Sequence, residues 1–185
     1  MVMVQVLLTM VAALAATVVF ASTADAPRIE VTERGGVYRV NASFTVAAPR
    51  ASVAAVLTDY ERIPDFMPDV TSSQILSRTE GGLVVEQEAI AKFMMFSKRV
   101  HLVLEVDEDG HTIRFRDRCG KSFKTYEGAW ILSETNGVTR VTYQLAAHPS
   151  FEVPGFVLKR LLKRDAAAMI DRLRAEIAGR VDLRQ

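Results

Sequence analysis

The side chains of this sequence that are best suited to acid–base, nucleophilic or metal chemistry are three histidines and one cysteine. His101, His111 and His148 stand apart, and none belongs to an H-E-x-x-H or comparable metal-ligand spacing. Cys119 is the only cysteine, which excludes an intramolecular disulfide and any zinc site built on several cysteines. We therefore interpret the histidines as satisfied or exposed residues and Cys119 as a partly buried small apolar residue, rather than as catalytic groups.

Glu86 and Glu88 lie two residues apart, and two carboxylates on one strand face could in principle share a proton. Gln87 alternates with the apolar residues Val85 and Ala89, so we expect Gln87 to face inwards and both glutamates outwards. The sequence also contains no glycine-rich phosphate loop and no G-x-S-x-G elbow. It therefore predicts no catalytic constellation, no metal site and no cofactor.

Three connecting segments carry large apolar side chains where ordinary loops are polar. They contain Phe66 and Met67 between two prolines, Phe93-Met94-Met95-Phe96 between two strands, and Phe151, Val153, Pro154 and Phe156 before the last helix. Methionines and aromatic rings adapt to irregular apolar ligands and can form a mobile entrance. We predict that these connectors surround the entrance of an apolar cavity; the alternative is that they only seal one end of the core.

Tyr126, Trp130 and Tyr143 combine an apolar body with a polar tip, which suits them to hold one oxygen of an otherwise apolar molecule. They would serve equally well as ordinary core residues. The predicted ligand-binding residues are Tyr60, Phe66, Met67, Phe93, Met95, Phe96, Tyr126, Trp130, Tyr143, Phe151, Leu158 and Met169.

The charge balance disfavours a nucleic-acid partner. Lys and Arg total 23 against 22 Asp and Glu, a formal net charge of +1, whereas affinity for nucleic acid rests mainly on neutralising phosphates. A local basic group, Lys159, Arg160, Lys163 and Arg164, has two interpretations. It forms the solvated face of a helix, or it rests on anionic lipid headgroups while the neighbouring phenylalanines touch the acyl boundary.

Apolar residues alternate with polar ones over residues 38–46, 100–106, 113–115 and 141–145, which predicts strands with one apolar face. Asp109-Gly110 and Asn136-Gly137 supply the backbone conformations of tight hairpin turns. Helices are predicted at 49–57 and from Pro154 to about Gly179, where apolar residues recur at three- and four-residue steps. The expected order is a strand, short helices, five or six further strands and a long helix. This order predicts an α+β domain whose curved antiparallel sheet is covered by the terminal helix.

The first residues differ in composition from the remainder. From Met1 to Ala24 there is no charged side chain, and an apolar run ends at small residues that include Ala24 and Ala26. This pattern predicts a signal peptide over residues 1–26, an exported protein and one domain over 27–185. Because the segment contains no Lys or Arg, an uncleaved membrane anchor is the alternative.

The segment Asp59-Tyr60-Glu61-Arg62-Ile63-Pro64-Asp65-Phe66-Met67-Pro68 places large apolar groups between two prolines. Since proline disfavours helical geometry in the residue before it, we expect Ile63 and Met67 to be extended or in turns. The segment resembles the D-Y-x-x-(I/L)-P-x-(F/M)-x-P signature of the START-like (SRPBCC) superfamily, in particular its polyketide cyclase/dehydrase and coenzyme Q-binding branch. The resemblance covers roughly residues 36 to 178 in the order of elements.

This resemblance implies a helix-grip fold with a ligand cavity between the sheet and the C-terminal helix. It further implies a protein that binds or carries a hydrophobic small molecule, such as an isoprenoid quinone, a lipid or a polyketide-like compound. The first alternative is a cyclase/aromatase-type enzyme acting on a polyketide-like substrate in the same cavity. The second is an interaction module with a filled core.

Overall fold

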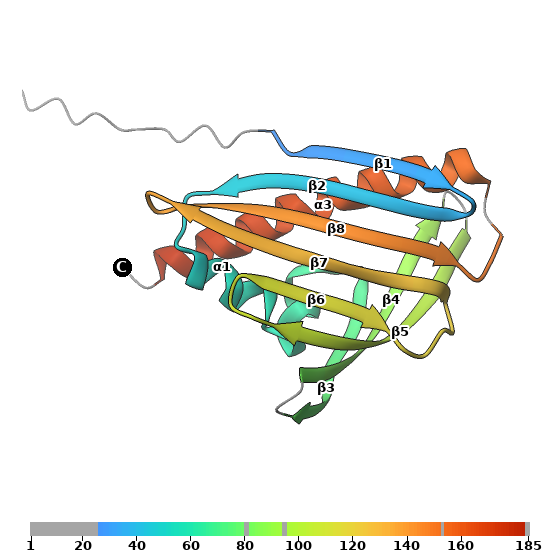
Figure 1. Ribbon diagram of the computed structural model, residues 1–185, viewed down its shortest axis with the longest axis horizontal. Helices are drawn as coiled ribbons and strands as arrows, with labels where there is room; N and C mark the ends of the chain where they lie inside the picture. The colour runs from blue at the N-terminus through green and yellow to red at the C-terminus, as the bar shows by residue number, and fades with distance from the viewer. Residues whose placement is uncertain (1–25, 80–81, 94–95, 153, 184–185) are drawn as a thin grey trace, which may run out of the picture.

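The computed structural model describes residues 26–79, 82–93, 96–152 and 154–183 of the chain. The elements in chain order are β1 (Arg28–Arg34), β2 (Val37–Val46), α1 (Arg50–Leu57), the 3-10 turn η1 (Tyr60–Arg62), α2 (Ile63–Phe66), β3 (Val70–Thr79), β4 (Gly82–Phe93), β5 (Phe96–Glu108), β6 (Thr112–Asp117), β7 (Phe123–Thr135), β8 (Val138–Pro149) and α3 (Gly155–Asp182). The predicted α+β helix-grip architecture is confirmed: a curved sheet holds a long C-terminal helix (Figure 1).

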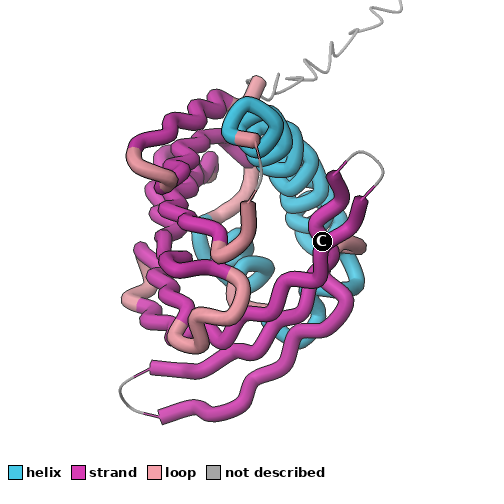
Figure 2. The backbone as a smooth tube through the Cα atoms, turned by 90° about the vertical axis from the view of Figure 1, so that its right-hand side faces the viewer, coloured by secondary structure: helices cyan, strands magenta, loops and turns pink. Residues whose placement is uncertain are grey.

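The eight strands form one antiparallel sheet in the order β1-β2-β8-β7-β6-β5-β4-β3. The sheet curves around its apolar face, and α3 lies across the open side (Figure 2). The alternation of apolar and polar residues along the strands places the apolar side chains on the concave face. There, Val141 and Val40 are 0% and 2% exposed. Their strand neighbours point to the convex face and to solvent.

Helix α3 has 28 residues and is therefore about 42 Å long. Its backbone comes closest to β1, β2 and α1, so the helix lies along one edge of the sheet. Ala166, Ile170, Leu173 and Ile177 join the main core, whereas Leu158 and Leu161 at the start of the helix form a separate small cluster with Tyr38. None of the helices within the described ranges is long and apolar enough to span a membrane.

Both predicted hairpin turns are confirmed, and the second shows why the sequence is suited to it. Asn136 and Gly137 link β7 to β8 with positive φ angles of 52° and 74°, which asparagine and glycine tolerate better than other residues.

One strand was not expected. Strand β1 precedes β2, pairs with it and carries charged residues at both ends, so its apolar alternation is reduced to Ile29 and Val31.

The expectation for Ile63 is wrong, and that for Met67 is confirmed. Ile63 has helical angles of −51° and −42° and opens the four-residue helix α2. Pro64 is tolerated because it occupies the first turn, where its missing N–H is not needed for an intrahelical hydrogen bond. Met67 follows the helix with angles of −118° and 81°, which is extended geometry as expected before Pro68.

Strand β3 forms one edge of the sheet and is irregular. Its register with β4 shifts between Val70 and Ser72 and again between Ile75 and Ser77. Leu76 lies within the second shift and is 48% exposed. The extra residues bend this edge strand locally, as β-bulges do.

Three arginines of α3, spaced eight residues apart, connect the helix to segments on the far side of the sheet. Arg164 donates to the Lys92 carbonyl oxygen at 3.4 Å, Arg172 binds Asp69 at 3.3 Å, and Arg180 binds Asp59 at 2.7 Å. Because these partners belong to β4 and to the connections around η1 and α2, the helix is held against both edges of the curved sheet.

Candidate ligand-binding site

Five aromatic rings from three neighbouring strands share the concave face of the sheet. Trp130 and Tyr143 have ring centroids 4.3 Å apart, and Phe115 lies 6.4 Å from Tyr143 and 5.9 Å from Tyr126. Phe123 continues the row at 4.9 Å from Tyr126. These rings form an aromatic row, made of Phe115, Phe123, Tyr126, Trp130 and Tyr143, that runs across β6, β7 and β8.

Strand register explains how the aromatic row forms. Trp130 pairs with Tyr143, and Phe115 pairs with Gly128, so all these positions point to the same face. Gly128 is needed for close packing, because a Cβ atom there would lie 2.6 Å from Cζ of Phe115. The absence of a side chain on β7 therefore leaves room for the Phe115 ring.

Phe123 reaches the concave face through an irregularity in β7. A regular strand would place residues 123 and 126 on opposite faces, because side chains alternate. The register with β8 shifts between Phe123 and Thr125, which inserts one extra residue and reverses the alternation. Sequence reasoning did not include Phe123 in the site, and simple alternation would have excluded it.

The hydroxyls of Tyr126 and Tyr143 interact in the interior. Burial raises the pKa of Tyr126, a hydrogen bond with Tyr143 lowers it in part, and the charge of Asp117 raises it further. Burial also raises the pKa of Tyr143 well above its usual value, and Tyr126 adds to this rise. Both side chains are therefore neutral phenols at physiological pH.

The aromatic rings around the pair keep part of their surface accessible. Phe115, Phe123, Tyr126 and Trp130 are only half-buried, although they point away from bulk solvent and lie on the covered side of the sheet. By contrast, Val141 on the same face has no exposed surface. These aromatic side chains therefore combine packing against the main core with accessible surface that an apolar ligand would cover.

A groove of about 620 Å³ lies at the end of the sheet where α3 begins. It is lined by Gly36, Tyr38, His148, Pro149, Phe151, Glu152, Pro154 and Leu158. Phe151 joins the groove to the interior, since its ring centroid is 6.3 Å from that of Phe123. The aromatic contacts thus continue from the groove to the Tyr126–Tyr143 pair.

Residues 38–178 match the family model described as polyketide cyclase/dehydrase and lipid transport. The chain belongs to this family. No curated protein sequence matches the chain significantly.

Solved structures with START-like folds are similar to the chain over most of its length. A STAR-related lipid transfer protein fragment from Xanthomonas axonopodis has a TM-score of 0.68 and 20% identity, covering 85% of this chain and 97% of that one. A START superfamily protein from Mycobacterium smegmatis has a TM-score of 0.65 and 18% identity, covering 76% and 97%. The Zhui aromatase/cyclase from Streptomyces sp. R1128 has a TM-score of 0.64 and 18% identity, covering 78% and 96%. At these identities the likeness establishes the START-like fold and leaves the individual function open.

Within this family fold, the structure divides the predicted ligand-binding residues into two groups. Tyr126, Trp130 and Tyr143 lie in the aromatic row, and Phe151 and Leu158 line the groove that leads to it. Phe66, by contrast, lies 5.9 Å below the guanidinium of Arg180. Twenty-five residues separate Gly155 from Arg180, which is about 38 Å along α3, so Phe66 and Phe151 lie at opposite ends of the helix and do not share one entrance.

Other predicted residues have packing roles or lie outside the description. The hydroxyl of Tyr60 donates to Glu108 at 2.7 Å, and burial followed by this hydrogen bond raises its pKa, so Tyr60 fixes η1 to the end of β5. Met67 and Met169 are half-buried against the main core. Met95 lies outside the described residues, and for Phe93 and Phe96 only the backbone at the β4–β5 turn is described.

Two polar features of the concave face were not assigned to the site from sequence. Gln87 faces inwards as expected and donates to Ser73 at 3.2 Å. Asp117 ends β6 and accepts hydrogen bonds from the backbone N–H groups of Val103, Cys119 and Gly120. Burial alone would raise the pKa of Asp117, but these hydrogen bonds outweigh it and the pKa is lowered, so a carboxylate is held beside the aromatic row.

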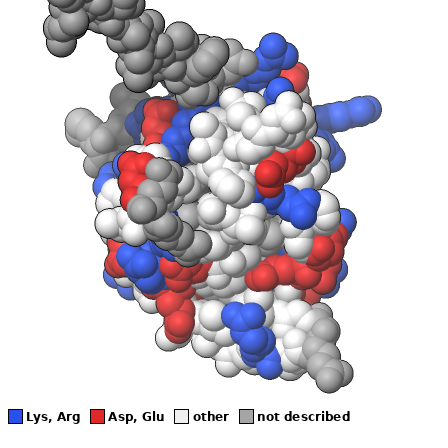
Figure 3. Space-filling view, turned by 90° about the vertical axis from the view of Figure 1, so that its left-hand side faces the viewer, with Lys and Arg blue, Asp and Glu red and all other residues white. Residues whose placement is uncertain are grey.

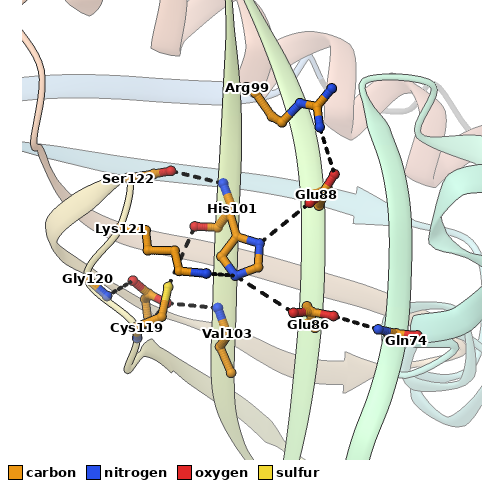
Figure 4. A network of polar contacts seen from close by, with 11 residues as sticks. Gln74, Glu86, Glu88, Arg99, His101, Val103, Cys119, Gly120, Lys121 and Ser122 are labelled. Carbon is orange, nitrogen blue, oxygen red and sulfur yellow. Dashed lines mark hydrogen bonds and ion pairs between the residues drawn. The ribbon is translucent and has the colours of Figure 1, made fainter.

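Of the three histidines considered at the outset, only His101 lies beside Glu86 and Glu88 (Figure 4), whereas His111 contacts Arg50 and His148 lines the groove. Glu86 and Glu88 face outwards as expected, and their carboxylates lie 3.8 and 3.7 Å from the two ring nitrogens of His101. Lys121 contacts the same ring at 3.3 Å. Cys119 is partly buried, with its Sγ 3.8 Å from the His101 carbonyl oxygen. Among the described residues no group of His, Cys, Asp and Glu is arranged to hold a metal ion.

The surface charges differ between the two ends of α3. Around the C-terminal end, basic and acidic side chains are interspersed (Figure 3). At the N-terminal end, Lys159, Arg160 and Lys163 are exposed, and Phe156 is 79% exposed beside them. Arg164 forms an ion pair with Asp165 at 2.9 Å and also donates to the Lys92 carbonyl oxygen. Unlike the other three basic residues, it is therefore engaged with neighbouring groups of the protein.

Proposed function

We propose that this protein binds and carries a hydrophobic small molecule between the concave face of its sheet and α3. The observation that supports this function best is the aromatic row, whose rings keep accessible surface beneath the helix and connect through Phe151 to the groove. A lipid, an isoprenoid quinone or a polyketide-like compound fits such an environment. Burying each methylene contributes about 0.8 kcal/mol, so a ten-carbon chain contributes about 8 kcal/mol with few polar contacts.

The alternative is a cyclase/aromatase-type enzyme that acts on a polyketide-like substrate in the same space. Tyr126, Tyr143 and Asp117 are the polar groups near the aromatic row that such a reaction could use. Asp117, however, is engaged by three backbone N–H groups, which holds it as a fixed carboxylate and opposes proton transfer during a reaction. Binding without turnover is therefore the function that we favour.

The binding proposal can be tested with protein purified from its own host. Native mass spectrometry should show an added mass that disappears after extraction with organic solvent, and the extract should contain one class of hydrophobic molecule. A Phe123→Ala variant should lose most of this ligand, while Ile131→Ala, which removes a 38% exposed side chain from β7, should retain it. Ligand-free wild-type protein that also fails to take up any apolar probe would contradict the proposal.

We further propose that the protein is exported and that residues 1–26 form a signal peptide, because the uncharged apolar run ends in the Ala24-x-Ala26 pattern. N-terminal sequencing of host-derived protein tests this assignment. A chain that starts near residue 27 is expected, whereas an intact Met1 in the membrane fraction would identify a retained anchor.

The N-terminal end of α3 is the part of the surface that we propose contacts anionic membranes while the ligand is exchanged. Phe156 and the basic residues beside it combine an exposed ring with positive charge, and each basic residue near an anionic surface contributes about 1 kcal/mol. Co-sedimentation should be stronger with vesicles containing phosphatidylglycerol than with phosphatidylcholine alone. Charge reversal at Lys159 and Lys163 should weaken it, and reversal at the exposed Lys124 should not.

A further inference from the structure

The first turn of α3 presents two backbone N–H groups that no group of the protein uses. Proline occupies the N-cap position, and the described residues provide no side-chain cap. Val157 and Leu158 donate to the Pro154 carbonyl oxygen at 2.9 and 3.1 Å. The N–H groups of Gly155 and Phe156, by contrast, have no hydrogen bond within the described part of the chain. Free N–H groups and the positive end of the helix dipole favour an anion at such a position.

Tyr38 adds a third donor at the same place. Its side chain is only 7% exposed, because its ring packs against Leu158 and Leu161, yet it lines the groove. A Cβ atom on Gly155 would lie 3.1 Å from the Tyr38 hydroxyl oxygen, so this oxygen lies at the start of α3. The hydroxyl makes no hydrogen bond to any described residue, although a buried tyrosine usually satisfies its O–H. It is therefore available to a molecule in the groove.

The charges around the groove decide which anion suits it. Lys159 is exposed one turn into α3, and its Cα–Cβ bond tilts towards the first turn, as in any α-helix. His148 lines the groove from the end of β8. Two carboxylates oppose these groups, since Glu152 lines the groove and the charge of Glu33 acts on Tyr38. This balance favours a singly charged anion over a dianion, because both carboxylates repel each further negative charge.

The ring of Phe156 indicates where such an anion comes from. This ring is 79% exposed on the residue whose N–H group is free. In a membrane, the phosphodiester of a phospholipid is singly charged and lies at the boundary between water and the acyl chains, where exposed aromatic rings are buried. A soluble phosphodiester would leave the ring in water.

Building on the proposed membrane contact, we propose that the groove at the start of α3 binds the phosphodiester group of a membrane phospholipid. The free phosphate oxygens accept hydrogen bonds from the N–H groups of Gly155 and Phe156 and from the Tyr38 hydroxyl, while the Phe156 ring enters the acyl boundary. The site belongs to the end of the sheet and not to the aromatic row, so it docks the protein on a membrane and does not hold the carried molecule.

Two soluble probes of nearly equal shape test the site: dimethyl phosphate, a singly charged diester, and trimethyl phosphate, its neutral triester. Each is titrated into the isotope-labelled full-length chain and followed by nuclear magnetic resonance. The backbone amide resonances of Gly155 and Phe156 should move downfield with dimethyl phosphate and should not move with trimethyl phosphate. Methyl phosphate in its dianionic form should bind no more tightly than the diester, despite its higher charge.

Four variants identify the groups that bind the diester. Tyr38→Phe should weaken dimethyl phosphate binding about three- to tenfold without lowering the melting temperature, because the lost hydroxyl has no partner among the described residues. Gly155→Ala should also weaken binding, since the new methyl group crowds this hydroxyl. Gly179→Ala, in the same helix with open space around its Cβ position, should not. Glu152→Gln removes a repelling carboxylate and should strengthen binding.

Co-sedimentation with phosphatidylcholine vesicles that contain phosphatidylglycerol tests the membrane as the source of the phosphodiester. Tyr38→Phe should bind these vesicles more weakly than wild-type protein. Tyr60→Phe makes the same chemical change where the hydroxyl already binds Glu108, so it should bind them as wild-type protein does.

The outcomes separate this site from the membrane contact on which it builds. Equal shifts with dimethyl and trimethyl phosphate, or wild-type binding of the diester and the vesicles by Tyr38→Phe, would overturn the site. A membrane contact that still depends on Lys159 and Lys163 would then stand without it. If dimethyl phosphate binds and no vesicle does, the groove takes a soluble phosphodiester, and both the membrane source and the membrane contact are wrong.

Discussion

Replacing Gly128 with alanine should destabilise the protein more than its small size suggests. The new methyl group would lie 2.6 Å from Cζ of Phe115 and closer still to the main-chain oxygen of Gln144 on β8. The Phe115 ring can rotate, but the Gln144 oxygen belongs to the paired strand and moves only if β7 and β8 separate locally. Overpacking of this kind costs about 1–3 kcal/mol, and we expect a value near 3 kcal/mol because backbone must shift.

The assay is thermal and urea-induced unfolding followed by circular dichroism. For a domain of this size each kcal/mol lowers the melting temperature by about 2–4 °C, so Gly128→Ala should lower it by roughly 6–12 °C. Gly179→Ala is the matched control. Its Cβ would meet no atom within 4 Å, and it lies inside α3, where alanine is favoured by up to about 1 kcal/mol.

A second substitution identifies which contact causes the loss of stability in Gly128→Ala. If the Phe115 ring is the main obstacle, Phe115→Leu in the Gly128→Ala background should recover stability, measured against Phe115→Leu alone. No recovery would assign the cost to the strand oxygen. The reasoning would be refuted if Gly128→Ala melts at the wild-type temperature, because the close approach of β6, β7 and β8 beneath the aromatic row would then be absent.

Three further predictions concern the Arg180–Asp59 contact, the ionisation of Asp117 and the role of Phe123 in ligand uptake. A double-mutant cycle with Arg180→Met and Asp59→Asn should give a coupling energy of about 1–2 kcal/mol, since their 2.7 Å contact is only partly exposed; a value near zero would show that the contact does not hold α3 to η1. Because the folded pKa of Asp117 lies below the unfolded value, its stabilising contribution is present above the unfolded pKa near 4 and is lost as the pH falls through the folded pKa. Asp117→Asn should therefore reduce the loss of unfolding free energy at acidic pH. An unchanged loss would contradict the stabilising role of the ionised Asp117. Uptake of a neutral fluorescent apolar dye should fall at least tenfold in Phe123→Ala and not in Ile131→Ala; equal losses would place Phe123 outside the ligand path.

Much of the fold could be predicted from the sequence because the relevant signals are local. Alternation with a period of two marked the inward faces of β2, β5 and β8, and Asn136-Gly137 marked a hairpin. Strand β1 was missed because charged residues at an exposed edge dilute the same alternation. Ile63 was misjudged because the rule for residues before proline does not hold in the first turn of a helix.

The site was less accessible to sequence reasoning because it depends on register and distance. Tyr126, Trp130 and Tyr143 were chosen for their chemistry, but only strand pairing places them together. Phe123 joins them through an extra residue in β7, which alternation does not predict. Phe66 and Phe151 share an apolar character and yet lie at opposite ends of α3, because the separation of two connectors depends on how a long helix packs.

The irregular edge strand β3 has a consequence for how copies of the protein meet each other. An open sheet ends in unpaired backbone groups, and such an edge can extend into a second molecule and start aggregation. The register shifts at Thr71 and Leu76 interrupt the straight row of donors and acceptors that a partner strand would need. At the opposite edge, β1 runs beside α3. The sheet can therefore stay open and curved while neither edge offers a long regular template for intermolecular pairing.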